Sequence, residues 1–242
     1  MRRGCHVHVA AHNVEFLVQG QSNRDCREGG DFRLERELYR HAKSVICIGD
    51  VDRFLVECLG ATARVVPYFP APEDVDRFQA ISDTRLSGPK KSRLLYIGTT
   101  HNPPTRAGLY DLIRQFEESF GEEWTLTIAG FGTDELVLPA DISRISIRGP
   151  ITDHELDALL CEVAGVLVFQ PPTTGFLTRL VEMNLSGVPV FINRSYIPAR
   201  GLEEYGIRTY QELGEVSDLI SLNAGEKFNK FAKPLAELFD CG

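Results

Sequence analysis

Short runs of apolar, mostly β-branched residues alternate along the chain with segments in which apolar residues recur at helical spacing. The first pattern is typical of strands buried on both faces, and the second is typical of amphipathic helices. The first pattern predicts strands at residues 6–12, 44–49, 63–69, 93–99, 124–132, 144–150, 165–171 and 188–193. The second predicts helices at residues 31–42, 51–60, 105–120, 153–164 and 175–187. This alternation predicts a doubly wound α/β fold with parallel sheets and helices on both faces.

The stretch from residue 70 to residue 91 divides the chain, because it loses the periodicity and gathers proline, acidic residues and lysine. The expected parts are a partial N-terminal Rossmann-like domain at 1–75, a linker at 76–92, a C-terminal Rossmann-like domain at 93–214 and a helical tail at 215–242. Only three strands are predicted before the division, so the first domain looks incomplete. One interpretation of the tail is a helix, kinked or restarted at Pro234, that packs back on the N-terminal domain.

Net charge and cysteine content limit the expected partners and the expected cellular compartment. The chain has 242 residues and a net charge of -8, which disfavours a general grip on nucleic acid because such binding needs a basic face. Its six cysteines form no CxxC pair and no spacing that suits zinc. A reduced, cytoplasmic setting is therefore expected, with peripheral membrane association as the alternative. No apolar run resembles a signal peptide or reaches the roughly 18 residues of a transmembrane segment.

Glycine and hydroxyl residues gather directly after the predicted strands of the C-terminal domain. Ligands of parallel α/β sheets bind at the carboxyl ends of strands, where glycine allows close approach and helix N-termini present free N–H groups. The segments concerned are Gly98–Asn102, Gly130–Gly132, Gly149–Ile151 and Gln170–Gly175. Each segment by itself also has a simpler interpretation, because turns favour glycine for conformational reasons alone.

The predicted helix 175–187 has two charged residues in an otherwise apolar pattern. If it begins near Gly175, Arg179 lies where a diphosphate would bind, and Glu182 shares a face with Gly175 and Thr178. Seven residues at ~1.5 Å rise place Glu182 roughly 10 Å from the helix start, which is about the reach from a nucleotide's phosphates to its ribose diol. The alternative is an i, i+3 ion pair between Arg179 and Glu182 on a solvated face.

Glu182 also belongs to a longer motif, GFLTRLVEMNLSGVPV. The motif resembles the signature G…K-x-x-E-A-M-A-x-G-x-P-V of GT-B glycosyltransferases of the family 4 type, which transfer sugar from a nucleotide-sugar donor with retention. Similarity to their donor domain extends to RLLYIGTTHNPPTRAGLYDLI, LTIAGFGTDEL and ISIRGPITDHELDALLCEVAGVLVFQP. Similarity to the last third of their acceptor domain lies in AHNVE and ERELYRHAKSVICIGDVDRFLVECLGATARVVPYFP. The resemblance implies a GT-B fold with an incomplete N-terminal domain.

The resemblance also implies roles for individual residues. Arg179 stands where the family usually has lysine against the diphosphate, and His12 would lie across the cleft near the reacting sugar; these two are the expected catalytic residues. Glu182 would hold the ribose. The other expected donor-binding residues are Gly98 and Thr99 at the phosphates or donor sugar, Thr100 and Gly130 beside them, Ile151 at the base through its backbone, and Thr174, Gly175, Phe176 and Leu177 at the helix start. A histidine at a strand end also has a structural interpretation.

Two departures from the family pattern bear on activity. The family often has a Glu-x7-Glu pair, and eight positions before Glu182 this chain has Thr174, where the missing acid would engage the donor sugar. The family's acceptor domain also has a long segment before the one similar to AHNVE, including its first βαβ units and a glycine-rich loop. Either the start of this chain is placed too late, or the protein is truncated and depends on a partner chain or has lost catalysis.

The leading hypothesis is a glycosyltransferase that moves a sugar from a UDP- or GDP-linked donor to a glycan, lipid or other acceptor, with retention and without a cofactor or metal. The alternative is a truncated, non-catalytic nucleotide-sugar-binding module or partner subunit. A nicotinamide-dependent dehydrogenase is disfavoured, because no G-x-G-x-x-G follows the first strand and no acidic residue lies about 20 positions further on.

Overall fold

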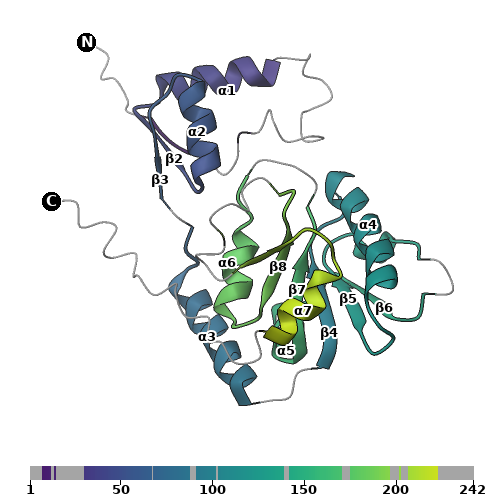
Figure 1. Cartoon of the computed structure of the whole chain (residues 1–242). Coiled ribbons are helices and arrows are strands. Elements are labelled where there is room, and N and C mark those ends of the chain that lie inside the picture. The colour runs from purple at the N-terminus through teal and green to yellow at the C-terminus, as the bar shows by residue number, and fades with distance from the viewer. Residues whose placement is uncertain are drawn as a thin grey trace, which may run out of the picture. The chain divides into compact units, whose positions relative to one another are not determined.

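The computed structural model of the chain describes residues 7–11, 14, 30–66, 68–87, 91–101, 103–138, 142–170, 175–196, 202 and 207–222. The chain forms two compact units (Figure 1). The N-terminal unit is Met1–Tyr68 with Pro172–Leu177, and the C-terminal unit is Phe69–Pro171 with Thr178–Gly242. All described strand pairs of both sheets are parallel, so the predicted α/β class is confirmed.

The N-terminal unit has a three-stranded sheet in the order β1-β2-β3. Its elements are β1 His8–Ala11, α1 Gly30–His41, β2 Ser44–Cys47, α2 Asp50–Cys58 and β3 Ala63–Val65. A small apolar cluster holds the unit together, and Val14, Val45 and Val56 are wholly buried in it. Four of these elements lie close to their predicted bounds. Strand β3 ends earlier than predicted, before Pro67, which has no N–H to donate to a sheet.

The C-terminal unit has a six-stranded sheet in the order β6-β5-β4-β7-β8-β9. Its strands are β4 Lys91–Ile97, β5 Thr125–Ala129, β6 Ile145–Gly149, β7 Val163–Val168, β8 Val190–Asn193 and β9 Arg208–Tyr210. Its helices are α3 Pro72–Ser87, α4 Pro103–Ser119, the 3-10 turn η2 Thr133–Glu135, α5 Asp153–Glu162, α6 Thr178–Leu185 and α7 Glu215–Leu222. The order reverses direction between β4 and β7, which is where doubly wound sheets bind their ligands.

Both faces of the six-stranded sheet are buried. Leu94 and Tyr96 of β4 belong to an apolar cluster to which α4 and α7 also contribute side chains. Leu95 lies between them in the strand and is also wholly buried, so it points to the opposite face. Helices α5 and α6 contact the sheet, and α3 packs against both of these helices. Burial on two faces explains why the strands of this unit are continuous apolar runs in the sequence.

The predicted linker at residues 76–92 is wrong. Most of it lies in α3, and its last residues belong to β4. Helix α3 begins with Pro72 at a position where a missing N–H costs nothing, and Phe78, Ile81 and Arg85 recur on one buried face. The unit boundary lies earlier, between Tyr68 and Phe69. The scattered prolines and charges hid a helical repeat that was present in the sequence.

Two other predictions near the C-terminus change. Helix α6 begins at Thr178 and not near Gly175, because Gly175 has a φ of 92°, outside the helical region. Strand β9 was not predicted, since it is only three residues long. The predicted tail contains α7, and Val216 of α7 is buried in the core of the C-terminal unit. The rest of the tail lies outside the described residues. No helix in the described part of the chain is long and apolar enough to cross a membrane.

Candidate binding site at the carboxyl edge of the C-terminal sheet

Glycines bring the ends of β4, β5 and β6 into close contact. The N–H of Gly98 donates to the carbonyl of Ala129 at 3.0 Å, and the N–H of Gly130 donates to the carbonyl of Gly149 at 2.8 Å. A Cβ on Gly130 would lie 2.0 Å from the carbonyl oxygen of Gly98, and its φ is 129°. Gly130 is therefore required by the packing of the strand ends, whatever ligand is present.

Gly98 is required for a different reason, because polar side chains surround it. A Cβ on Gly98 would lie 2.9 Å from Nη1 of Arg179 and 3.1 Å from the hydroxyl oxygen of Tyr96. Arg179 belongs to the first turn of α6, so the structure brings this predicted catalytic residue to the end of β4. Among the described residues, neither Nε of Arg179 nor the hydroxyl of Tyr96 has a hydrogen-bond partner, although both atoms are buried.

The pKa of Tyr96 reflects both its burial and its nearness to Arg179. Burial raises the pKa of Tyr96, while the positive charge of Arg179 acts in the opposite direction. Tyr96 is wholly buried and therefore remains a neutral phenol that can donate and accept hydrogen bonds. The sequence pattern does not distinguish Tyr96 from a core residue, because it is an aromatic residue inside an apolar strand.

The turn after β4 contains one buried and two exposed candidate residues. The backbone N–H of Thr100 donates to the carbonyl of Phe131 at 3.0 Å, and Nε of Arg106 donates to the carbonyl of Thr100 at 3.0 Å. The hydroxyl of Thr100 is buried without a partner among the described residues. Thr99 and His101 are exposed, and the His101 ring lies 4.8 Å from the ring of Phe131. The rim of the site is therefore polar and aromatic.

An asparagine ties the ends of β7 and β8 together. The side chain of Asn193 accepts from the N–H of Gln170 and donates to the carbonyl of Gln170, both at 2.7 Å, and it also donates to the hydroxyl of Ser195. The Oε1 atom of Gln170 is buried and has no partner within the described part of the chain. Sequence analysis included Gln170 only as the start of a segment, and it missed Asn193.

The turn from β6 into α5 is fixed by a capping box. The hydroxyl of Thr152 accepts from the N–H of Glu155, and the carboxylate of Glu155 accepts from the N–H of Thr152. Ile151, predicted to meet the base through its backbone, is half-buried directly before this cap. The cap holds the backbone of Ile151 in a defined position.

The remaining predicted site residues differ in where the structure places them. Glu182 is half-buried and lies one turn after Thr178, so its distance from the helix start is about 6 Å at the usual rise, and not roughly 10 Å. Gly175, Phe176 and Leu177 precede α6 and group with the N-terminal unit. His12 and Thr174 lie outside the described residues. No cluster of three or more potential metal ligands occurs within the described ranges.

Comparisons with known proteins identify the fold. No family model and no curated protein matches the chain. Among solved structures, it is similar to Anabaena HepE in complex with UDP, with a TM-score of 0.60 and 14% identity over 90% of this chain. It is also similar to sucrose-phosphate synthase from Thermosynechococcus elongatus, with a TM-score of 0.65 and 15% identity over 89% of this chain. The chain has the GT-B fold.

A third similar structure, a glycosyltransferase from Rickettsia africae, has a TM-score of 0.62 and 11% identity over 91% of this chain. In each comparison nearly the whole of this chain is matched, but much of the other protein is not. The chain covers 62% of HepE, 58% of the sucrose-phosphate synthase and 62% of the Rickettsia protein. It therefore spans about three fifths of the length of these solved structures.

Proposed function

We propose that the chain acts in glycosyl transfer, binding a nucleoside diphosphate sugar and delivering its sugar to a glycan, a lipid-linked molecule or another acceptor. The observation that carries the proposal is the position of Arg179, whose guanidinium lies against Gly98 at the carboxyl edge of the sheet. A cation beside an exposed backbone at the start of a helix is suited to a diphosphate. Anabaena HepE, which has the same fold, was solved with UDP bound.

The proposed donor site holds the nucleotide with groups from α6, the end of β4 and the turn before α5. Arg179 and the first N–H groups of α6 neutralise the diphosphate, and Gly98 and Thr99 let it approach the end of β4. Glu182 accepts hydrogen bonds from the ribose hydroxyls, since a carboxylate can bind a vicinal diol. The backbone of Ile151 contacts the base. Thr100 and Gly130 hold the end of β4 in position.

The proposed chemistry is a transfer with retention and without a metal ion. The leaving group is a nucleoside diphosphate, and its departure is assisted by positive charge placed where negative charge develops. Arg179 supplies a full charge there, and the N-terminus of α6 supplies part of one. His12, near the reacting sugar in this proposal, is the second catalytic residue.

The second candidate is a nucleotide-sugar-binding module that does not turn over alone. What supports it is Thr174, which stands eight positions before Glu182, where the family that the motif resembles often has an acidic residue for the donor sugar. A partner chain that completes the N-terminal unit would then supply the acceptor site. Both candidates share the donor site, and they differ in whether the chain by itself hydrolyses or transfers from a sugar nucleotide.

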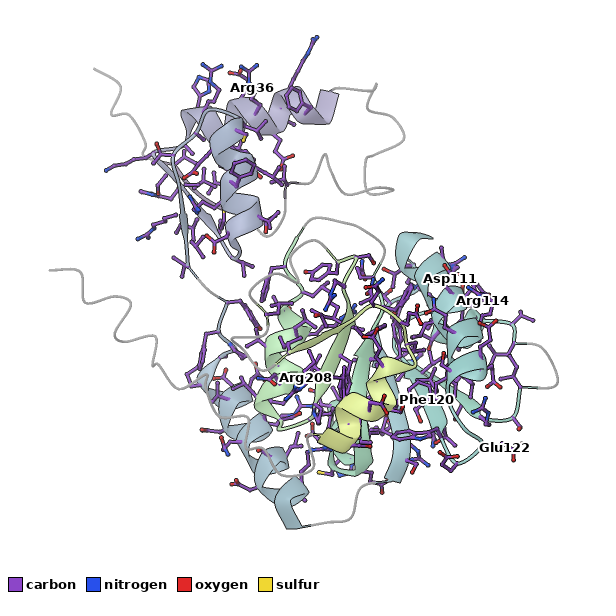
Figure 2. The ribbon with its side chains drawn as sticks, in the orientation of Figure 1. Arg36, Asp111, Arg114, Phe120, Glu122 and Arg208 are labelled. Atoms are coloured by element: carbon purple, nitrogen blue, oxygen red, sulfur yellow. The ribbon has the colours of Figure 1, made fainter. Side chains whose placement is uncertain are left out.

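The test is a thermal-shift series of the 242-residue chain with UDP, GDP and ADP, repeated on Glu182→Ala and on Arg114→Ala. Arg114 is a suitable control, because it is exposed on α4 and its ion pairs with Asp111 at 3.9 Å and Glu118 at 3.3 Å are exposed surface pairs of small value (Figure 2). One nucleoside diphosphate is expected to raise the melting temperature of the wild type and of Arg114→Ala. Glu182→Ala is expected to weaken its binding by about 1–3 kcal/mol.

Sugar-nucleotide hydrolysis, measured with the donor whose nucleotide gives the shift, then separates the two candidates. Turnover by the chain alone supports the transferase. Binding without turnover supports the binding module. A folded wild type that responds to none of the three nucleotides would contradict the donor site itself.

A further inference from the structure

Two buried polar groups without partners lie against the same glycine. The hydroxyl of Tyr96 and Nε of Arg179 are both buried, and neither is hydrogen-bonded to any described residue. The Cβ position of Gly98 is 3.1 Å from the Tyr96 hydroxyl and 2.9 Å from Nη1 of Arg179. Buried polar atoms in folded proteins almost always have hydrogen-bond partners, so two neighbouring buried atoms without partners need an explanation.

The same apolar cluster contains a tyrosine that follows the rule. Tyr210 is wholly buried in the cluster that includes Tyr96, and its hydroxyl donates to the carbonyl of Val168 at 3.4 Å. Phenylalanine at position 96 would fill the same volume without burying an oxygen. The hydroxyl of Tyr96 therefore costs stability that packing does not require.

The two groups are chemically complementary. The Nε–H of arginine can only donate, and a phenol hydroxyl can accept that hydrogen bond while donating its own proton elsewhere. The guanidinium is planar, so fixing one edge on Tyr96 leaves its other N–H groups in a defined direction. Gly98 keeps the space between the two side chains free of a Cβ.

We propose that Tyr96 is a positioning residue for Arg179: its hydroxyl accepts a hydrogen bond from the guanidinium when Arg179 binds the phosphates, and so holds the cation against the end of β4. The inference rests on the proposed function and deepens it. Tyr96 acts through Arg179 and does not itself contact the reacting atoms. Its effect should therefore be seen only for ligands that carry phosphate.

The experiment is a double-mutant cycle in the full 242-residue chain. Affinities for UDP and GDP are measured by calorimetry and compared with those for uridine and guanosine, in wild type, Tyr96→Phe, Arg179→Ala and the double variant. Tyr210→Phe is the matched control, since it removes a buried phenol hydroxyl from the same cluster. We expect Tyr96→Phe to weaken binding of the nucleoside diphosphate about 5- to 10-fold, which is the size of one ordinary hydrogen bond, because Tyr96 acts on the ligand only through Arg179.

The nucleoside affinity should not change in Tyr96→Phe, and in the Arg179→Ala background the substitution should have no effect on either ligand. Melting temperatures without ligand give an independent readout. Tyr96→Phe should melt at the wild-type temperature or up to ~2 °C higher, because an unpaired buried hydroxyl is removed, whereas Tyr210→Phe should melt lower and keep its affinity.

The inference is overturned if Tyr96→Phe binds the nucleoside diphosphate as wild type does, or if it loses the same factor with Arg179 absent. A lower melting temperature with unchanged affinity would make Tyr96 purely structural. If wild type responds to none of UDP, GDP and ADP in the thermal-shift series, the proposed function fails, and this inference fails with it. If wild type binds a nucleoside diphosphate and Tyr96→Phe binds it equally well, the inference about Tyr96 fails and the proposed function is unaffected.

Discussion

Each edge of the six-stranded sheet has an arginine with a buried guanidinium atom, and the two arginines differ in their hydrogen bonds. Arg85 is buried, whereas Arg179 is half-buried with a buried Nε. At the amino edge, Nη1 of Arg85 in α3 donates to the carbonyls of Leu160 and Val163, and its Nε donates to the carbonyl of Gly187. At the carboxyl edge, Nε of Arg179 has no partner in the described part of the chain.

We therefore interpret Arg85 as a structural cation and Arg179 as a cation whose Nε is available to a new partner. Arg85 joins α3 to the last turn of α5 at Leu160, to the start of β7 at Val163 and to the turn after α6 at Gly187. The carboxyl edge instead collects unpaired buried atoms: besides Arg179 they are Tyr96 Oη, Thr100 Oγ1 and Gln170 Oε1. Several buried polar atoms without partners that gather at one place mark a side on which a polar ligand is expected.

The largest effect is expected for Arg85→Met. Two buried carbonyl oxygens and one half-buried carbonyl oxygen would lose a donor, so the free energy of unfolding should fall by about 3 kcal/mol or more. Burial lowers the pKa of Arg85 to about 10, so the side chain is still charged near neutral pH and the wild type keeps the full interaction. Urea denaturation measures the loss, and Arg114→Met on the exposed face of α4 is the control. A loss similar to that of the control would remove the structural role.

The next effect compares two glycines, one at each edge. A Cβ on Gly130 would meet the backbone carbonyl of Gly98 at 2.0 Å, whereas a Cβ on Gly187 would meet the side-chain oxygen of Ser82 at 2.6 Å. The backbone cannot move aside as a serine rotamer can. Gly130→Ala should therefore cost about 3 kcal/mol and Gly187→Ala about 1–2 kcal/mol, the latter mainly for its positive φ. Equal losses in urea denaturation would contradict this difference between the edges.

Arg179→Met should behave in the opposite way to Arg85→Met. Its stability should change by less than about 1 kcal/mol, because no hydrogen bond of its Nε is lost. Affinity for a nucleoside diphosphate should fall about 10- to 100-fold, while affinity for the nucleoside should stay the same. Calorimetry on both ligands checks this. Equal losses for nucleoside and nucleoside diphosphate would argue against a phosphate contact.

The smallest effect concerns a buried carboxyl group in the N-terminal unit. Burial raises the pKa of Asp52 in α2 from 3.8 to about 6, and its Oδ1 has no partner among the described residues. Because the folded state binds this proton more tightly than the unfolded state, the contribution to stability is complete below pH 3.8 and is lost as the pH rises through about 6.

Asp52→Asn should remove that pH dependence and raise the free energy of unfolding at pH 8 by about 1 kcal/mol. Urea denaturation at pH 4, 6 and 8 would show it. Asp50→Asn is the matched control, since Asp50 is exposed in the same turn. A wild type and an Asp52→Asn variant with the same pH dependence would mean that Asp52 is solvated in the folded protein.

Sequence alone recovered most strands and helices, because each carries its own period. Leu94 to Ile97 read as a strand buried on both faces, and the six-stranded sheet buries it on both. The errors came where a period was short or interrupted. Helix α3 was read as a linker, although Phe78, Ile81 and Arg85 lie on one face, and three-residue β9 was missed. Gly175 was assigned to a helix that its positive φ excludes.

For the site, the sequence determined that glycines follow the strands and that Arg179 stands near the start of a helix. Only the tertiary structure decided what each one does. Gly130 serves the packing of strand ends, and Gly98 makes room for polar side chains. Tyr96 and Arg179 are far apart in the chain, but both lie next to Gly98 at the end of β4. They come together because the strand order of the sheet differs from the sequence order. Local periodicity specifies elements, whereas hydrogen-bond partners depend on which elements become neighbours.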